Sequence, residues 1–435
     1  MKKIVVVGMF VFGSLAAPLF AQAGAPIHLT LQEAEALALK NHPRVLAQQN
    51  VAGAFNQRIT ETRSAYYPTV DGDITGSAGN IGARIGAGYL TDSRIINHIG
   101  LGFTVNQLIT DFGRTANLVA QSRLQANATE QDLRATQYDV LMAVNRVYYA
   151  ILRAQALIKV AQQTLSARQL VLKQITALAQ NKLRSDLDVS FAGVNVADAQ
   201  LLLISSQNEL QASYAEMARA LGQDQPATYD LVEMPLPPSP PENVEQLVIE
   251  AIQNRPELAS LRLNLQAAQR FEQAERDLSR PNVNLLGVTG YQPYIDQITL
   301  PRVIPNEYAG GAVNIQIPVF NGHLFTARQE EARYKSLEAE QRLRDSMQQI
   351  EREVRIAWAT SMTAYQQLDV TATLLRQATL AMNLAQGRYD NGLSTVVDLT
   401  LAQTNLTNAE IQNLSAKYNY QAEYAGLQYT IGALR

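Results

Sequence analysis

The sequence predicts a mainly α-helical protein that carries a membrane β-barrel. The expected chain contains a duplicated unit of long coiled-coil helices and four membrane-spanning strands. Three observations indicate this fold class: a motif from the first half returns in the second half, long stretches contain no proline, and four short segments alternate apolar with polar residues. Strict alternation is typical of a strand, whereas long stretches with helical periodicity are typical of helices.

The N-terminal segment, residues 1–23, has the pattern of a secretory signal peptide. Two lysines precede an apolar run from Ile4 to Ala17, and an Ala-Gln-Ala triplet with the small-residue pattern of a cleavage site follows. The apolar run is shorter than the roughly 20 residues that span a bilayer as a helix. We therefore expect an exported protein whose mature chain begins near Gly24.

Composition narrows the classes of site and partner. The chain has no cysteine, which excludes disulfides, thiolate metal sites and a lipid-bearing cysteine after the signal peptide. Its formal net charge of −3 argues against nucleic acid as a partner. We expect no segment after the signal peptide to be long and apolar enough for a membrane helix, so any membrane segments should be strands.

The chain contains two copies of one unit. The sequence LALKNHPRVLA around Pro43 returns as EAIQNRPELAS around Pro256, at a spacing of 213 residues. Pairs further along the chain are 210 residues apart, which indicates a small deletion in the second copy. We expect a first structural repeat over residues 24–222, an extended proline-rich linker over 223–243 and a second repeat over 244–435.

Each repeat contains two segments with strand periodicity, at about 68–79 and 98–108 in the first repeat and about 281–291 and 312–320 in the second. At about ten residues each, they have the length of membrane strands. Aromatic residues near the strand ends fit interfacial belts, namely Tyr66, Tyr67, Phe112, Tyr291, Tyr308 and Phe320. The alternative is a small periplasmic sheet that packs on the helices.

Four strands cannot close a lipid-facing barrel alone. The smallest such barrels have about eight strands, and an open edge leaves backbone groups unpaired in lipid. If the strands enter a membrane, several chains must therefore share one barrel.

The longest helix of the first repeat is expected over about residues 115–180. No proline occurs from Arg114 to Gln225, and apolar residues recur at every seventh position, at Val144, Ile151, Ile158, Leu165, Leu172 and Ala179. This repeat is typical of a coiled coil. At 1.5 Å per residue the helix would be roughly 100 Å long. The helices alone leave a fibrous spacer open as an alternative.

The long helices are interrupted at matching places in the two repeats, and we expect these breaks to be the tips of two helical hairpins. Ser185–Asp188 and Thr395–Asp398 have capping-box spacing at a helix start. One expectation for both acids is therefore helix capping. The other is that symmetry arranges them as an acidic ring that constricts a pore and favours cations.

Four features resemble the TolC family of outer membrane factors over essentially the whole mature chain. They are the duplicated unit, the Asn-X-Pro motif of each repeat, the sequence LITDFGR over 108–114 and the sequence GLSTVVDL over 392–399. The resemblance implies that a homotrimer shares one twelve-stranded barrel, which a periplasmic α-barrel continues. It implies the exit channel of a tripartite efflux or type I secretion system in the outer membrane of a Gram-negative-type bacterium.

The resemblance also implies roles for residues at the tips. It matches Asp398 to a pore-constricting aspartate and Tyr389 to a residue whose contacts keep the tip closed, with Asp188 as the acid of the first tip. Familiar members carry a second acid where this chain has Leu401 and a basic residue where it has Ser394. The acidic gate of the family is therefore only half present.

The resemblance further implies a periplasmic adaptor that docks on the tips through a Gly-Leu turn. The expected contact residues are Lys182, Leu183, Arg184, Gly392, Leu393 and Ser394. Lys182 stands where glycine is usual, and helix C-capping is the alternative role of Gly392. The other expected partners are an inner-membrane transporter and outer membrane lipid. Drugs, metal ions, peptides and secreted proteins are all open as substrates.

Two other classes of protein compete with this interpretation. An enzyme is disfavoured because the four histidines are scattered without ligand spacing and no nucleophile or phosphate-binding motif appears, so we expect no cofactor or metal. A structural coiled-coil protein or adhesin with a trimeric β anchor would keep its strands together near the C-terminus. Here the strand pairs lie in different repeats.

Overall fold

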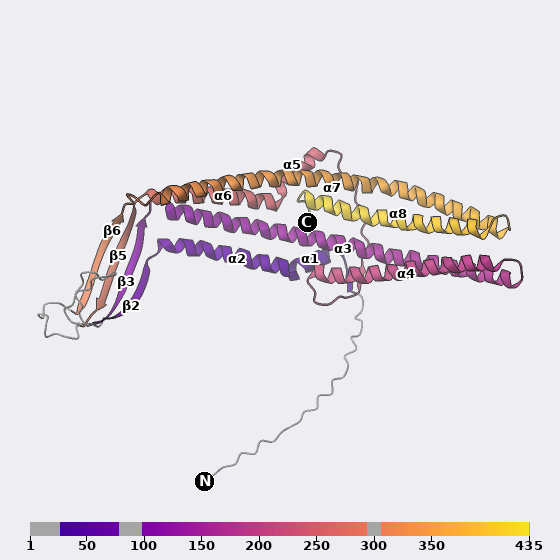
Figure 1. Ribbon diagram of the computed structural model, residues 1–435, viewed down its shortest axis with the longest axis horizontal. Coiled ribbons are helices and arrows are strands. Elements are labelled where there is room, and N and C mark those ends of the chain that lie inside the picture. Colours follow the sequence, from indigo (N-terminus) through magenta and orange to yellow (C-terminus); the bar gives the residue numbers. More distant parts are fainter. Residues whose placement is uncertain (1–26, 78–97, 294–305, 435) are drawn as a thin grey trace, which may run out of the picture.

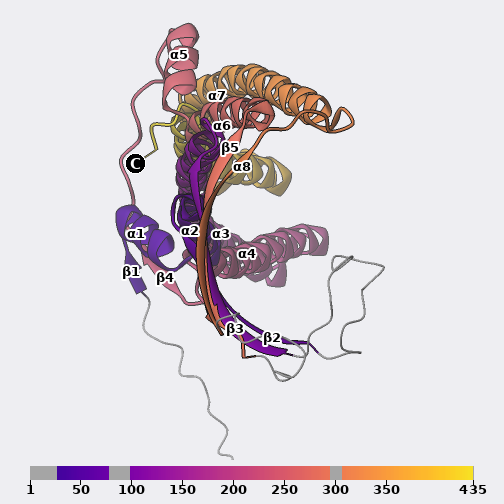
Figure 2. The ribbon, with the colours of Figure 1, turned by 90° about the vertical axis from the view of Figure 1, so that its left-hand side faces the viewer.

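The computed structural model describes residues 27–77, 98–293 and 306–434. The expected signal peptide and the end of the first expected strand lie outside the described residues. The molecule is a long rod with a four-stranded sheet at one end and two helical hairpins that extend to the other (Figure 1). Viewed along the rod, the sheet and the helices follow one curve, whose convex side carries α1, β1, β4 and α5 (Figure 2).

The same order of elements occurs twice. The first half consists of β1 (Ile27–Leu29), α1 (Leu31–Asn41), α2 (Pro43–Arg63), η1 (Ser64–Tyr66), β2 (Thr69–Ser77), β3 (His98–Thr110), α3 (Arg114–Gln180) and α4 (Asp186–Leu221). The second half consists of β4 (Tyr229–Leu231), α5 (Val244–Asn254), α6 (Pro256–Arg276), η2 (Asp277–Ser279), β5 (Asn282–Tyr291), β6 (Glu307–Gln316), α7 (Leu324–Asp390) and α8 (Val396–Thr430). Helices α3 and α7 both have 67 residues.

A glycine at the end of each hairpin allows that end to pack closely against the Asn-X-Pro motif. Gly222 follows α4 at a φ of +69°, and a Cβ atom there would lie only 2.8 Å from the backbone oxygen of Asn41. Gly432 follows α8 at a φ of +72°, and its Cβ would lie 3.1 Å from the carbonyl carbon of Asn254. Only glycine adopts this left-handed conformation without strain, so each long hairpin can end against the break between two short helices.

The sheet has the strand order β2-β3-β5-β6 with antiparallel neighbours. Its register places the apolar side chains Val70, Ile74, Ile99, Leu101, Phe103, Leu285, Val313 and Ile315 on one side, the apolar face. Asp71, Asp73, Thr104, Asn106, Asn284 and Asn314 lie on the other side, called the polar face, although Leu286 and Val288 of β5 share it. All the apolar-face residues named here are exposed. The expected alternative of a sheet packed on the helices is therefore wrong.

The fourth strand is shifted from its expected position. The sequence predicted residues 312–320, whereas β6 spans Glu307–Gln316. Gly310 and Gly311 hide the alternation in the first half of the strand because they carry no side chain. Pro318 lacks the N–H that a strand ladder needs, so the apolar residues around it do not extend the strand.

One aromatic residue of the expected interfacial belts faces the other way. Tyr308 pairs with Gly290, which pairs with Gly102, and this row of residues belongs to the polar face. Tyr291 lies in the neighbouring row on the apolar face, as a belt residue should. The expectation of a belt role for Tyr308 is wrong, because proximity to a strand end does not specify the face.

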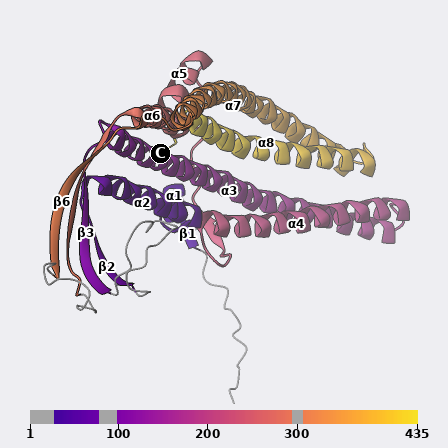
Figure 3. The same ribbon diagram turned by 60° about the vertical axis from the view of Figure 1, so that its left-hand side comes forward.

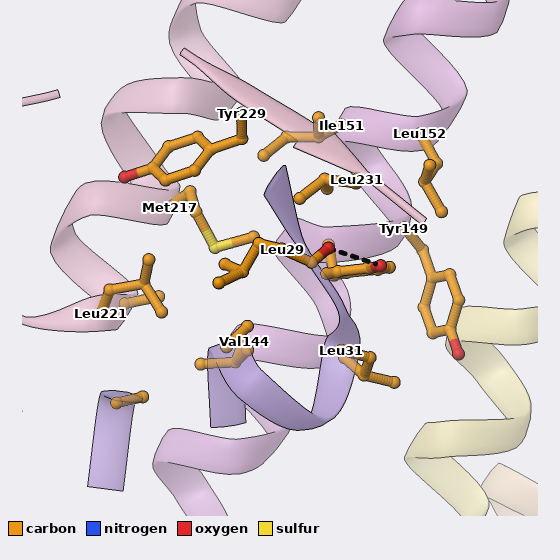
Figure 4. Close-up of a cluster of buried hydrophobic side chains, with 14 of the residues drawn as sticks. Leu29, Leu31, Val144, Tyr149, Ile151, Leu152, Met217, Leu221, Tyr229 and Leu231 are labelled. Atoms are coloured by element: carbon orange, nitrogen blue, oxygen red, sulfur yellow. Dashed lines mark hydrogen bonds between the residues drawn. The ribbon is translucent and has the colours of Figure 1, made fainter. Parts of the chain in front are cut away.

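The largest core lies where α3 passes α1, β1, β4 and α4 (Figure 4). Val144 and Ile151 of α3 are fully buried, in agreement with the predicted heptad stripe, and Tyr148, which lies outside that stripe, is fully buried as well. The Tyr148 hydroxyl donates to the Leu29 and Val232 backbone oxygens at 3.2 and 2.7 Å. Side chains from the last helix, Tyr418 and Ala425, also belong to this core.

The proline-rich linker is fastened to both halves of the chain. Its short strand β4 pairs in parallel with β1, which three-residue segments could not reveal in the sequence. The Gln421 side chain donates to the Met234 carbonyl at 2.8 Å, and the Trp358 indole donates to the Pro241 carbonyl at 2.7 Å. Tyr420 likewise donates to the Pro238 carbonyl. The linker is thus extended, as predicted, but is also packed.

One described helix, α4, is long and apolar enough by composition to cross a membrane, with a mean hydropathy of 1.4 over its most apolar stretch. The expectation that no such segment exists is wrong. Only 11% of this stretch is buried, because α4 packs against α3 on one side and presents apolar residues outward on the other. The composition of α4 therefore reflects two apolar faces of a coiled-coil helix.

Candidate functional site

The candidate site lies at the tips of the two helical hairpins, at the end of the rod opposite the sheet (Figure 3). The first tip connects α3 to α4 over residues 181–185, and the second connects α7 to α8 over 391–395. The predicted hairpins are therefore confirmed. Six of the nine residues that the sequence singled out lie in these two connections, and Asp188, Tyr389 and Asp398 lie in the adjoining helix ends.

The two tips share one backbone turn. Lys182 and Gly392 both have left-handed backbones, with φ of +59° and +71°. In each tip the next residue closes the helix end: the Leu183 N–H donates to the Leu178 carbonyl at 2.9 Å, and the Leu393 N–H donates to the Arg388 carbonyl at 2.8 Å. This is the Schellman pattern of a helix C-terminus. The expected capping role of Gly392 is thus confirmed, and Lys182 adopts the same turn.

The acids of both tips cap the helices that follow. The Asp188 N–H donates to the Ser185 hydroxyl and the Ser185 N–H donates to the Asp188 carboxylate, both at 3.2 Å. The Thr395 N–H donates to the Asp398 carboxylate at 3.0 Å, and this bond holds the pKa of Asp398 below its usual range. Both capping boxes predicted from the sequence are therefore confirmed.

The two tips pack against each other through Tyr389. This side chain is only 7% exposed, and it belongs to a cluster with Ile175 and Ala192 of the first hairpin and Val396 and Leu399 of the second. Burial raises the pKa of the Tyr389 hydroxyl. That hydroxyl has no hydrogen-bond partner within the described part of the chain.

Arg184 contacts the second tip from the first. Its guanidinium carbon lies 4.9 Å from the centre of the Tyr389 ring, a cation–π distance. Both residues line an open cavity between the tips, together with Gln174, Ala177, Leu178, Leu183, Asp390 and Gly392. The sequence assigned Arg184 to a contact with another protein, and it gave no sign of this contact within the chain.

The remaining tip residues divide between the surface and the interior. Leu183 and Leu393 are 70% and 69% exposed, although leucine is usually buried. Ser394 is half-buried, and its hydroxyl has no partner among the described residues. Leu401 is also exposed.

Sequence reasoning missed three polar contacts that join the hairpins above the tips. The buried Arg168 of α3 donates to the Asn195 carbonyl at 3.0 Å and to the Thr404 hydroxyl of α8 at 3.4 Å. The Asn195 amide donates to the Thr400 hydroxyl at 3.0 Å. Thr164 and Thr407 lie 3.4 Å apart through their hydroxyls. Polar residues within an apolar heptad stripe were the available signal for these contacts.

Metal binding has no support at the tips. Among residues 27–77, 98–293 and 306–434, no group of three or more histidine or acidic side chains is placed to hold a metal ion. Charged side chains at or beside the tips include Asp188, Asp398, Asp390 and Arg184.

Long helical hairpins attached to an antiparallel sheet with an exposed apolar face define the class of the molecule: an outer membrane channel protein with long helices. The chain belongs to the outer membrane efflux protein family, because the sequence profile of that family matches residues 36–223 and 247–433. The resemblance inferred from the sequence is therefore confirmed.

Individual relatives agree with this assignment. The solvent efflux pump outer membrane protein SrpC of Pseudomonas putida is 25% identical over 385 residues, which cover 86% of this chain and 78% of SrpC. The outer membrane protein TolC of Salmonella enteritidis is 21% identical and is covered over 70% of its length by 78% of this chain. The structure of the outer membrane protein VceC from Vibrio cholerae matches with a TM-score of 0.78 at 17% identity, over 93% of this chain and 97% of VceC. The predicted fold class is thus confirmed.

Proposed function

We propose that three copies of this chain form an outer membrane channel that passively conducts substrates out of the cell. In this proposal a periplasmic adaptor and an inner-membrane transporter deliver the substrates to the tips. The observation that carries the proposal is the sheet, whose apolar face is exposed in the single chain while its polar face carries Asp71 and Asp73. Such a sheet is stable when lipid contacts its apolar face and water contacts its polar face.

The strand edges support a shared barrel. Within the described sheet, β2 and β6 pair on one side only. An unpaired edge in lipid leaves backbone groups without partners, so β6 of one chain should pair with β2 of the next. Three chains supply twelve strands, which exceeds the roughly eight strands of the smallest membrane barrels.

The helices support the same assembly. Leu187, Phe191, Val194, Leu201 and Ile204 form an exposed apolar stripe along α4. Their spacings of three, four and seven residues place them on one side of the helix. A neighbouring chain in the trimer would cover this stripe, which extends the strand barrel into an α-barrel.

The tips would be both the gate and the docking site. We propose that Asp188, Asp398 and Tyr389 narrow the periplasmic end of the pore. The exposed Leu183 and Leu393, with their flanking tip residues Lys182, Arg184, Gly392 and Ser394, would contact the adaptor. The matching backbone turns support this proposal, because each tip presents one exposed leucine from the same kind of turn.

The experiment is mass measurement of the detergent-purified mature protein, followed by recording in planar bilayers. We expect the mass of three chains and discrete conducting steps. A stable monomer would overturn the shared barrel. A trimer without conductance would instead favour a coiled-coil or adhesin-type envelope protein, an alternative that the family profile across both halves does not favour.

A further inference from the structure

A row of four residues crosses the polar face of the sheet and places two glycines beside a tyrosine. Asp73, Gly102, Gly290 and Tyr308 are paired in that order across β2, β3, β5 and β6. The two central positions carry no side chain. The backbone beside the tyrosine at one edge of the row is therefore not covered by side chains of the two central residues.

The Tyr308 ring lies against this uncovered backbone. A Cβ atom added to Gly290 would lie 2.5 Å from the ring carbon that bears the hydroxyl, and one added to Gly102 would lie well under 3.0 Å from the hydroxyl oxygen. Real Cβ contacts are essentially never so short. The ring thus spans two strands and directs its hydroxyl along the row toward Asp73, instead of projecting away from the sheet.

The row is near the outer ends of β5 and β6, whereas β2 and β3 continue four residues beyond it. Tyr308 is the second residue of β6 and Gly102 the fifth of β3, whereas the opposite end of β3 leads into α3. The helices leave the sheet at that opposite end (Figure 1). In a closed barrel whose lumen is lined by the polar face, three copies of Tyr308 would surround the outer mouth.

We propose that Gly102 and Gly290 are positioning residues that hold Tyr308 flat against the barrel wall and thereby set the width of the outer mouth. This inference rests on the proposed function. Glycine in a strand normally weakens it, and an aromatic side chain that covers the glycine compensates for that loss. The same contact keeps a bulky ring out of the path of the substrate.

The sharpest test is Gly102→Ala, measured as single-channel conductance in planar bilayers. The new methyl group must displace the end of the Tyr308 side chain, so we expect the ring to lift into the lumen and the conductance to fall. Gly102→Ala combined with Tyr308→Ala should restore it. The matched control is Gly310→Ala on the same face, where the added Cβ would meet Val288 at an ordinary 3.7 Å.

The outcomes separate this inference from the proposed function. If the wild-type protein forms no channel, the proposed function fails. If the wild type conducts and Gly102→Ala conducts equally well, or if Gly310→Ala lowers conductance as much, the positioning role is refuted.

A second measurement covers the case in which Gly102→Ala fails to assemble, since its Cβ would also approach the Thr289 carbonyl at 3.0 Å. The natural chain has no cysteine, so Tyr308→Cys introduces a unique thiol. A bulky water-soluble thiol reagent should then reduce conductance of Tyr308→Cys channels and leave Tyr291→Cys channels unchanged. The reverse pattern would place Tyr308 outside the lumen and overturn the inference.

Discussion

The two halves of the chain have matching helices but bury them to different extents. Both α3 and α7 contain 67 residues, yet 19 residues of α3 are buried in the single chain against seven of α7. Proline, glycine and capping residues that set helix ends recur in both halves, whereas the residues between them differ. The comparison teaches that a few local signals determine the backbone plan, while the side chains between them decide how much each half depends on other chains.

The residue before the repeated proline shows this divergence most clearly. His42 accepts the Arg44 N–H at 3.2 Å and thereby caps α2. Its counterpart Arg255 is buried, and it forms ion pairs with Glu257 at 3.0 Å and Glu353 at 2.8 Å. The second half thus uses paired charges at a place where the first half uses a local cap.

The largest effect is expected from replacing Gly222. Comparison with Gly432 tests whether the two hairpin ends tolerate an added side chain equally. Gly222→Ala should destabilise the protein by roughly 2 to 5 kcal/mol, since alanine adds left-handed strain and a clash with the Asn41 backbone. Gly432→Ala should cost only about 1 to 2 kcal/mol, because its contacts are longer. Thermal unfolding of the purified variants measures both. An equal or larger loss at Gly432 would contradict the comparison.

The sheet is where the two halves should behave alike. Lysine at Leu101 or at Val313, one from each half, should impair membrane assembly by roughly 2 to 4 kcal/mol near the bilayer midplane. Thr104→Lys is the matched control on the polar face and should be tolerated. Quantified trimer in outer membrane fractions gives the readout. Equal tolerance at all three positions would mean that neither face meets lipid.

The tips offer a smaller effect with opposite signs in the two halves. Lys182 occupies the left-handed position that Gly392 occupies in the second tip, so Lys182→Gly should stabilise the first turn by about 0.5 to 1 kcal/mol. Gly392→Lys should destabilise the second turn by a similar amount. Differential scanning calorimetry of the two variants measures the signs. If Lys182→Gly destabilises the protein instead, the lysine side chain must make a contact whose stabilisation outweighs the backbone strain.

The smallest expected effect concerns the two capping acids. Asp188→Asn together with Asp398→Asn should lower cation preference modestly, because two neighbouring acids, Asp186 and Asp390, keep their charge. Reversal potentials in a salt gradient provide the measurement, and unchanged selectivity with intact trimers would remove both acids from the gate. Because the pKa of Asp398 is lowered, its capping contribution is present above its unfolded pKa and is lost as the pH falls through the folded value.

Local patterns in the sequence predicted most of the fold, for identifiable reasons. The repeated proline, the long runs without proline and the alternation around Leu101 are short-range signals, and they located the helices and three strands. The fourth strand was misplaced because Gly310 and Gly311 have no side chains to alternate. The polar position of Tyr308 depends on cross-strand register, which a single strand does not reveal.

The candidate site was predictable only where it is local. Spacing alone identified the capping boxes at Ser185 and Thr395. The contact between Arg184 and Tyr389, and the contact between Arg168 and Thr404, join residues more than 200 positions apart in the chain. No periodicity records such pairs, because they depend on how one complete hairpin lies against the other.

The position of the last helix in the first half's core has a consequence for the order of folding. Tyr418 and Ala425 belong to a core whose other members come from the first half of the chain and from β4, and α8 also fastens the linker. The core of the N-terminal half therefore cannot be completed until α8, at the end of the chain, packs onto it. Contacts between residues so far apart in the chain slow folding. Removing the last twenty or so residues should accelerate hydrogen exchange around Tyr148, far away in the sequence, because the core it leaves behind is unfinished.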